Sequence, residues 1–303
     1  MPQRKRVLRD EDDARASSST ATKKKPAADQ GKKKSSLLAS ATISSAFTLE
    51  SVTSRARAVT ESISKEIDND NVFAAAKVHY LTSDRASWVY HVPRWFLQVY
   101  PHLSQSQSDG PDPRLSYGEW LDQLWRLHPE VPGTIKMFGR DVLTPRFQQA
   151  YGMSYHFSGN SYLSKPLPDL IQHCVDTMQA MVVDPATTHK TLLTAIIVNW
   201  YANGEHYIGP HSDDQPIVYP HSPVFSLSLG ATRKFVFTAK SGNSRGASAP
   251  NEMTKRLELV LEDGDLVVMG GTTQQSHKHA LPKMKKCTEK RICITLRCVI
   301  PPR

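Results

Sequence analysis

The sequence predicts an α+β protein whose core is an antiparallel double sheet or barrel. Two segments with apolar residues at helical spacing come first, and a series of short segments rich in Val, Ile, Phe and Thr follows residue 190. Turn signals such as Asp263-Gly264 and Gly270-Gly271 separate some of the later segments. This order differs from that of a doubly wound fold, in which strands and helices alternate.

The folded domain is predicted over residues 71–303, because all five tryptophans lie beyond its start. Within it, the periodicity predicts helices over residues 117–127 and 168–183. The strands predicted from β-rich composition cover residues 192–202, 224–229, 234–239, 257–261, 265–269 and 291–299.

The first 70 residues are predicted to form a disordered basic tail. They are rich in Ser, Ala, Thr and Lys, and Phe47 is their only aromatic residue, so they bury too little apolar surface to offset chain entropy. One basic cluster begins at Arg4, and another runs from Lys23 to Lys34. Such clusters suit a nuclear import signal or a phosphate-binding arm. We therefore expect a nuclear protein, or otherwise a cytoplasmic one.

Charge and composition narrow the class of partner. The net charge of +9 favours polyanions such as nucleic acid. The longest apolar runs, such as residues 192–198, are shorter than the roughly 20 residues of a membrane-spanning helix, and no apolar segment follows the N-terminus as in a secretory signal. The four cysteines form no Cys-x-x-Cys pair, which fits a reducing compartment. We expect a soluble intracellular monomer with no membrane partner.

Two histidines and an aspartate are the candidate metal ligands. His211 and Asp213 are two residues apart, so in an extended segment both side chains point to the same side. A third ligand is expected from the stretch that contains His277 and His279. Two imidazoles and one carboxylate leave positions open for a co-substrate and O₂, as in Fe(II) oxygenases. A zinc hydrolase with an open water position uses the same ligand types and stays open as an alternative.

An arginine pair in the last predicted strand favours the oxygenase. Arg291 and Arg297 are six residues apart with Thr295 between them, so all three share one face of an extended strand. The intervening Ile and Leu residues occupy the other face, which we expect to pack in the core. Because guanidinium groups bind carboxylates well, the polar face predicts a site for a co-substrate that carries a carboxylate. An exposed charged strand is the alternative interpretation.

Four motifs together resemble the AlkB family of oxidative demethylases in order and spacing. They are Asn199-x-Tyr201, His211-x-Asp213, His279-Ala280-Leu281-Pro282 and Arg291-x5-Arg297. The resemblance extends upstream through Met137-Phe138-Gly139, Pro145-Arg146, Tyr151-Gly152 and Tyr155-His156-Phe157-Ser158-Gly159, and covers about residues 130–303. These upstream pieces are most similar to the duplex-DNA repair branch, the AlkB homologue 2 type.

The resemblance implies a role for each matching residue. His211, Asp213 and His279 would be the iron ligands and the catalytic centre, with His279 favoured over His277 on motif register. The 2-oxoglutarate site would consist of Asn199, Tyr201, Arg291, Thr295 and Arg297, in which the two arginines neutralise the carboxylates. It also implies a double-stranded β-helix (jelly roll) over about residues 190–303 with flanking helices, preceded by a nucleotide-recognition lid at about residues 130–165.

By the family's chemistry, Fe(II), O₂ and 2-oxoglutarate together oxidise the N-alkyl carbon of a damaged base. That carbon leaves as formaldehyde, with succinate and CO₂ as co-products. The expected substrates are bases such as 1-methyladenine and 3-methylcytosine in alkylated nucleic acid, with duplex DNA favoured.

The resemblance also assigns substrate contacts. Phe138 matches an intercalating finger, and apolar wedges of this kind hold unstacked base steps. Tyr155 and Phe157 match aromatic residues of the lid, and the remaining expected contacts are Ser158, Asp214 and Gln215.

The sequence departs from the family at two places. Gln215 stands where the resembling proteins carry an acidic residue near the exocyclic group of the base, and a neutral amide predicts a different selectivity between methyladenine and methylcytosine. The spacing between Tyr151-Gly152 and Tyr155 is also shorter. Two other functions stay open: a hydroxylase or demethylase acting on RNA or protein, and a non-catalytic nucleic-acid binder, which would not need a complete ligand set.

Overall fold

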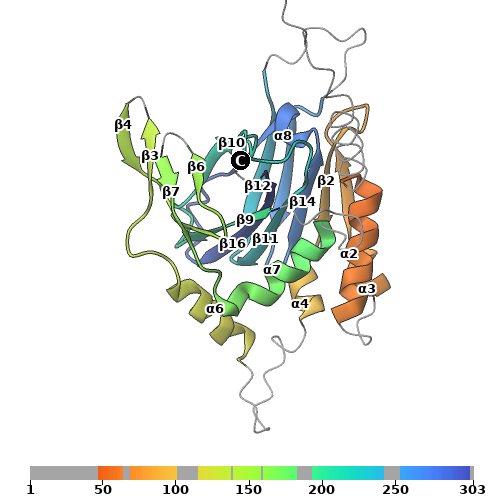
Figure 1. The fold of residues 1–303 in the computed structure, drawn as a ribbon, viewed down its shortest axis with the longest axis horizontal. Coiled ribbons are helices and arrows are strands. Elements are labelled where there is room, and N and C mark those ends of the chain that lie inside the picture. Colours follow the sequence, from red (N-terminus) through yellow and green to blue (C-terminus); the bar gives the residue numbers. More distant parts are fainter. Residues whose placement is uncertain are drawn as a thin grey trace, which may run out of the picture. The chain divides into compact units, whose positions relative to one another are not determined.

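The structure, a computed structural model, describes residues 47–63, 69–100, 115–137, 139–157, 160–182, 193–241 and 253–300. Within this part of the chain, two β-sheets carry most of the strands, and helices pack beside the larger sheet (Figure 1). The arrangement confirms the predicted α+β class and its antiparallel double sheet.

The larger sheet has eight strands in the order β1-β2-β14-β11-β16-β9-β5-β8. Paired strands are antiparallel except β5 and β8, which are parallel. In sheet order, the strands are Lys77–Tyr80, Ser87–Val92, Leu266–Gly271, Val224–Gly230, Arg291–Val299, Leu193–Tyr201, Phe147–Tyr151 and Ser164–Lys165.

The smaller sheet has four antiparallel strands in the order β10-β15-β12-β13. They are Ile208–His211, His277–Leu281, Arg233–Ala239 and Arg256–Leu261. Val224 and Val267 of the larger sheet share a buried apolar cluster with Phe237 and Leu281 of the smaller one. The two sheets therefore pack on each other through their inner faces, as in a jelly roll.

A second apolar cluster joins the opposite face of the larger sheet to the helices. Trp200 and Ile294 of the sheet are buried there together with Val52 and Met178 of helices α2 and α7. The described helices are α2 (Leu49–Ile63), α3 (Asn69–Ala74), α4 (Trp95–Val99), α6 (Tyr117–Arg126), α7 (Asp169–Val182) and α8 (Thr273–Ser276). Among them, no helix is both long and apolar enough to cross a membrane.

Strand β16 shows how this layering positions polar side chains. Ile292, Ile294 and Leu296 belong to the helix-side cluster. The alternating residues, which include Cys293 and Thr295, point to the other side, toward the smaller sheet. The predicted division of this strand into an apolar and a polar face is therefore confirmed.

Local sequence signals explain the helices that were predicted. Ser116 caps α6, because its hydroxyl accepts from the Glu119 N–H while the Glu119 carboxylate accepts from the Ser116 N–H at 2.9 Å. Helix α7 has Ile171, Val175 and Met178 buried along one face. Both helices lie within a residue of their predicted ends.

Two expectations about the first half of the chain need correction. Helix α2 lies inside the predicted tail, and its Val52, together with the preceding Phe47, is buried in the core. Packing against α7 supplies the burial that the polar composition of α2 did not indicate. Strands also precede α7, so the chain does not pass from helices to strands in one step. Residues 1–46 of the predicted tail lie outside the described residues.

Two β-hairpins occupy the region predicted as a nucleotide-recognition lid. One pairs β3 (Thr134–Met137) with β4 (Arg140–Leu143), and the other pairs β6 (Tyr155–Phe157) with β7 (Asn160–Tyr162). Figure 1 shows them together at one side of the sheets, and β3 contacts β7.

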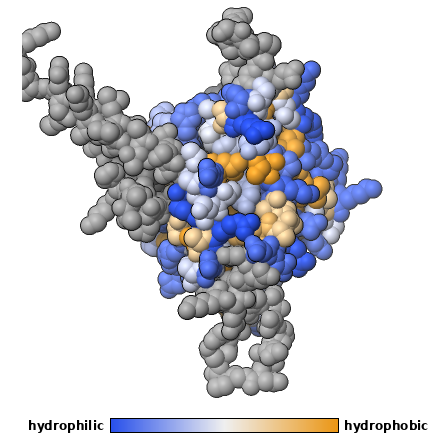
Figure 2. Space-filling view, turned by 90° about the vertical axis from the view of Figure 1, so that its right-hand side faces the viewer, coloured by the Kyte–Doolittle hydropathy of each residue, from blue (hydrophilic) through white to orange (hydrophobic). Residues whose placement is uncertain are grey.

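On the face drawn in Figure 2, hydrophilic residues separate the hydrophobic ones into small groups.

Candidate metal and co-substrate site

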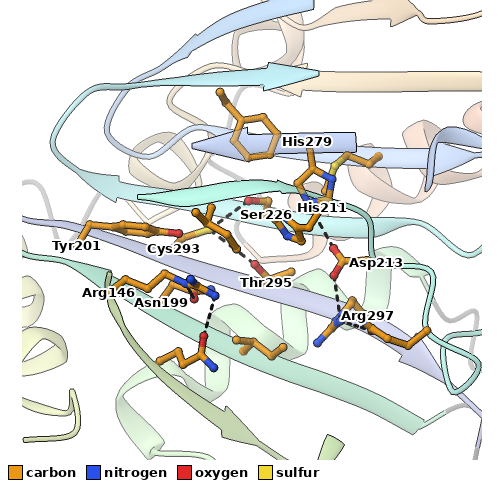
Figure 3. A pocket seen from close by; sticks show the side chains of 16 residues that line it. Arg146, Asn199, Tyr201, His211, Asp213, Ser226, His279, Cys293, Thr295 and Arg297 are labelled. Carbon is orange, nitrogen blue, oxygen red and sulfur yellow. Dashed lines mark hydrogen bonds and ion pairs between the residues drawn. The ribbon is translucent and has the colours of Figure 1, made fainter. Parts of the chain in front are cut away.

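Two imidazoles and one carboxylate converge between the sheets. His211 ends β10 and pairs in register with His279 of β15, and their ring centroids are 4.2 Å apart. Asp213 follows two residues after His211, and its Oδ2 lies 3.6 Å from Nε2 of His279. One candidate ligand atom from each of the three lies within 4.8 Å of the others, and no other such group occurs among the described residues. Figure 3 shows them side by side.

The local electrostatics keep these groups in metal-binding form. Burial lowers the pKa of His279 to about 3, and it also lowers the pKa of His211. Burial opposes ionisation of Asp213, but the Arg297 guanidinium and the two imidazoles outweigh it and hold the pKa of that carboxyl below its usual value. Neutral imidazoles and an ionised carboxylate are the forms that coordinate a metal.

The backbone around Asp213 is held by α8 and by Lys240, the residue after β12. The Asp213 N–H donates to Oε1 of Gln274 at 2.9 Å. Lys240 donates to the backbone carbonyl of Gln274 at 2.8 Å and forms an ion pair with Asp214 at 2.9 Å. Lys240 therefore holds the backbone of Gln274, and the Gln274 side chain in turn holds the backbone of Asp213.

The rival ligand His277 points elsewhere. Its Nδ1 accepts from the Ser276 hydroxyl at 2.8 Å, and its Nε2 donates to the Thr254 carbonyl at 2.9 Å. Both ring nitrogens are therefore engaged in structural hydrogen bonds. The structure brings His279, and not His277, to the other two ligands.

A cavity opens beside the triad, and His211, Asp213 and His279 form part of its lining. Four of the five residues predicted to bind 2-oxoglutarate line it, namely Asn199, Tyr201, Thr295 and Arg297. Asn199 and Tyr201 come from β9, and the other two come from the neighbouring β16 (Figure 3). The cavity walls therefore join the triad to the predicted co-substrate residues.

Arg291 is the exception, because it is not among the residues that line the cavity. It is buried, its Nη2 donates to the Ser228 hydroxyl at 2.8 Å, and its guanidinium carbon lies 5.4 Å from the ring centroid of Tyr201. Arg291 pairs in register with Tyr201 on the neighbouring strand, so the two side chains lie beside each other. The Nε of Arg291 is buried and has no hydrogen-bond partner among the described residues, so this guanidinium keeps a donor available.

The sequence reasoning missed a second guanidinium in the cavity. Arg146 is buried and lines it, with Nε donating to Oδ1 of Asn199 at 2.8 Å and Nη2 donating to Oε1 of Gln148 at 2.7 Å. The Nε2 of Gln148 is buried and has no hydrogen-bond partner among the described residues. The two-residue spacing of Arg146 and Gln148 at the start of β5 was the signal that an inward-facing polar pair was present.

The predicted substrate residues divide into three groups. Gln215 lines the cavity and accepts from Arg297 Nη1 at 2.8 Å, whereas the exposed Asp214 pairs with Lys240 outside it. Tyr155 and Phe157 lie in strand β6, and the structure describes the backbone of both residues. Phe138 and Ser158 lie outside the described residues.

The family of the chain follows from comparison with known proteins. A family model described as the 2OG-Fe(II) oxygenase superfamily matches residues 117–297. The chain belongs to this superfamily, and it is therefore a dioxygenase by class.

Its similar relatives are of the AlkB type, which confirms the resemblance seen in the motifs. DNA oxidative demethylase ALKBH2 of Mus musculus is 31% identical over 172 residues, covering 56% of this chain and 68% of that protein. ALKBH2 of Arabidopsis thaliana is 31% identical over 202 residues, covering 60% and 62%. The alkB homolog 3 dioxygenase of Rattus norvegicus is 29% identical over 193 residues, covering 62% and 61%. For the last two, the match spans less than two thirds of the relative.

The residues present fit the groups that this superfamily implies, which are Fe(II), 2-oxoglutarate and O₂. Two imidazoles and one carboxylate are the donor set of non-haem iron oxygenases and leave coordination positions open. The guanidiniums of Arg146 and Arg297, with the unpartnered amide nitrogen of Gln148, suit a dicarboxylate in the adjoining cavity.

Proposed function

We propose that the protein is an oxidative demethylase that repairs N-alkylated bases, such as 1-methyladenine and 3-methylcytosine, in DNA. It would use Fe(II), O₂ and 2-oxoglutarate and release formaldehyde, succinate and CO₂. The observation that carries the proposal is one cavity that joins the His211–Asp213–His279 triad to a wall of guanidinium and amide groups.

His211, Asp213 and His279 would hold the iron. Burial keeps the imidazoles neutral, and Arg297 keeps Asp213 ionised, so the site binds a cation without first releasing protons. When bound, the iron and 2-oxoglutarate supply the oxidation of the alkyl carbon by O₂. The remaining cavity residues orient the reactants and exclude water.

The co-substrate would lie along β9 and β16. Four of the five predicted contacts line the cavity, namely Asn199, Tyr201, Thr295 and Arg297, and Arg146 with Gln148 extends the same wall. Guanidinium groups are suited to carboxylates because they offer two parallel donors. Arg291 lies against the Tyr201 ring with a buried Nε that has no partner among the described residues, and it would bind a carboxylate of the co-substrate from there.

The substrate would be alkylated nucleic acid, with duplex DNA favoured. The net charge of +9 suits a polyanion, and the printed names of the ALKBH2 relatives refer to DNA. The hairpins β3–β4 and β6–β7 would form the recognition lid, with Phe138, Tyr155, Phe157 and Ser158 contacting the base or its gap. The basic N-terminal clusters would direct a monomeric enzyme to the nucleus.

A hydroxylase or demethylase acting on RNA or protein is the second candidate. Its metal and co-substrate chemistry would need the same cavity, so the triad and its wall support both functions equally. The positive charge and the ALKBH2 relatives favour DNA.

The direct test uses purified protein with Fe(II), ascorbate and 2-oxoglutarate. We expect formaldehyde release from oligonucleotides that contain 1-methyladenine or 3-methylcytosine, and we expect the His211→Ala variant to release none. Methylated oligonucleotides left unchanged, while a protein extract stimulates 2-oxoglutarate turnover, would instead establish the second candidate.

The duplex preference has its own test. The Phe138→Ala variant should lose more activity on duplex than on single-stranded oligonucleotides, because a wedge is needed only where a base leaves a stack. Equal losses on both substrates would remove the wedge from the proposal.

A further inference from the structure

The amide of Gln215 has a fixed orientation in the cavity. Its Oε1 accepts from Arg297 Nη1 at 2.8 Å, and the same nitrogen donates to Oδ1 of Asp213 at 3.0 Å. An arginine side chain has donors and no acceptor. The oxygen of the Gln215 amide must therefore face Arg297, and the NH₂ group must face away from it.

The NH₂ group of Gln215 is the end that meets a ligand. Gln215 lines the cavity, and its Nε2 has no hydrogen-bond partner among the described residues. The shared Arg297 nitrogen makes its amide a neighbour of the Asp213 carboxylate in the triad. A ring whose alkyl group reached the triad would bring its neighbouring substituent close to this hydrogen-bond donor.

The charges of the cavity act in the same direction. Arg146 and Arg297 line it, and Asp213 is the only carboxylate among the described lining residues. Asp213 is already paired with Arg297, and Asp214 outside the cavity is paired with Lys240. The lining residues thus leave no carboxylate free to pair with a cationic ring.

We propose that Gln215 selects N-alkylated bases that carry a carbonyl oxygen beside the alkylated nitrogen, and disfavours those that carry an amino group there. This inference rests on the proposed demethylase function and ranks its substrates, with the neutral keto bases above the amino-bearing 1-methyladenine and 3-methylcytosine. The Gln215 NH₂ group donates to the carbonyl oxygen, whereas an amino group would place two donors face to face.

Two methylated pyrimidines isolate this difference. 3-Methyluracil has a carbonyl at position 4 and is neutral, while 3-methylcytosine has an amino group at that position and is cationic at neutral pH. The alkylated nitrogen, the methyl group and the carbonyl at position 2 are the same in both. A preference for one of the two bases therefore reports on how the protein contacts the substituent at position 4.

The experiment measures kcat/KM for formaldehyde release from matched oligonucleotides that carry one of these bases. We expect 3-methyluracil to be favoured about tenfold or more, the ratio that corresponds to one mismatched buried hydrogen bond. Gln215→Glu should reverse the preference, because a carboxylate accepts from the amino group and offsets its charge. Gln215→Met, which has neither donor nor acceptor, should bring the ratio toward one.

A binding measurement separates recognition from turnover. Fluorescence anisotropy under anaerobic conditions, with Fe(II) and 2-oxoglutarate present, should show the same order of affinities for the wild type and its reversal in Gln215→Glu. A wild-type preference for 3-methylcytosine, or a ratio that Gln215→Glu leaves unchanged, would overturn the assignment while leaving the demethylase intact. If every variant and the wild type leave both bases unoxidised, the demethylase proposal itself fails and the inference falls with it.

Discussion

Arg297 donates from Nη1 to the carboxylate of Asp213 at 3.0 Å, and both side chains are buried. The contact joins the last strand of the larger sheet to the loop after β10. It gives the buried carboxylate a counter-charge within the protein, so the negative ligand can exist before a metal is bound.

Replacing Arg297 by Met should therefore destabilise the metal-free protein by about 3 kcal/mol or more, because it leaves a buried carboxylate unpaired. A bound cation would restore the missing charge, so Mn(II) should stabilise the variant more than it stabilises the wild type. Urea unfolding with and without Mn(II) measures both effects.

Arg233→Met is the matched control for this prediction. Arg233 is also fully buried, but its guanidinium binds the backbone carbonyls of Asn203, His206 and Pro282. Its loss should cost stability without enlarging the response to Mn(II). An equal Mn(II) response in both variants would contradict the role given to the Arg297–Asp213 pair.

The choice between the two histidines of β15 can be measured by metal-induced stabilisation. Mn(II) should raise the Tm of the wild type, and His279→Asn should remove this rise because it deletes a ligand. His277→Asn should lower the Tm, since it breaks two buried hydrogen bonds, but the rise with Mn(II) should persist. The converse pattern would make His277 the ligand.

Gly270 in β14 tests the close contact between this strand and β2. A Cβ at Gly270 would lie 2.0 Å from Cζ2 of the buried Trp88 ring, and a buried indole cannot move aside without disturbing the core. Gly270→Ala should cost about 1–3 kcal/mol or more in urea unfolding. Gly118→Ala in α6, where nothing lies within 4 Å, should be neutral or slightly stabilising. A tolerated Gly270→Ala would mean that the strands separate easily.

Much of the fold was predictable because its strands alternate. In β16 the apolar residues Ile292, Ile294 and Leu296 all pack against the helices. Their alternation with a period of two is visible in the sequence and identifies the strand. Helix α2 was not predictable in this way. Most of its residues are polar, and its burial depends on α7, which is distant in the sequence.

The site was predictable where spacing along one strand determines which side chains share a face. That reasoning placed Thr295 and Arg297 together, as the cavity lining shows, and motif register separated His279 from His277. It could not indicate that Arg291 lies against the Tyr201 ring and outside the cavity lining, because that depends on packing across the sheet. It also missed Arg146, whose place in the cavity depends on the pairing of β5 with β9.

The last prediction concerns Gln274, which positions the backbone of Asp213 through a hydrogen bond to its N–H at 2.9 Å. Groups that orient metal ligands usually contribute tenfold or more to metal affinity. Gln274→Ala should therefore weaken Mn(II) binding about tenfold, measured by calorimetric titration, while the metal-free protein loses only about 1 kcal/mol. Gln274→Glu keeps an acceptor at this position and should restore affinity. Gln275→Ala, at the exposed neighbouring position, is the control and should leave Mn(II) binding unchanged. If Gln275→Ala lost as much affinity as Gln274→Ala, the effect would come from α8 as a whole and not from the Gln274 hydrogen bond.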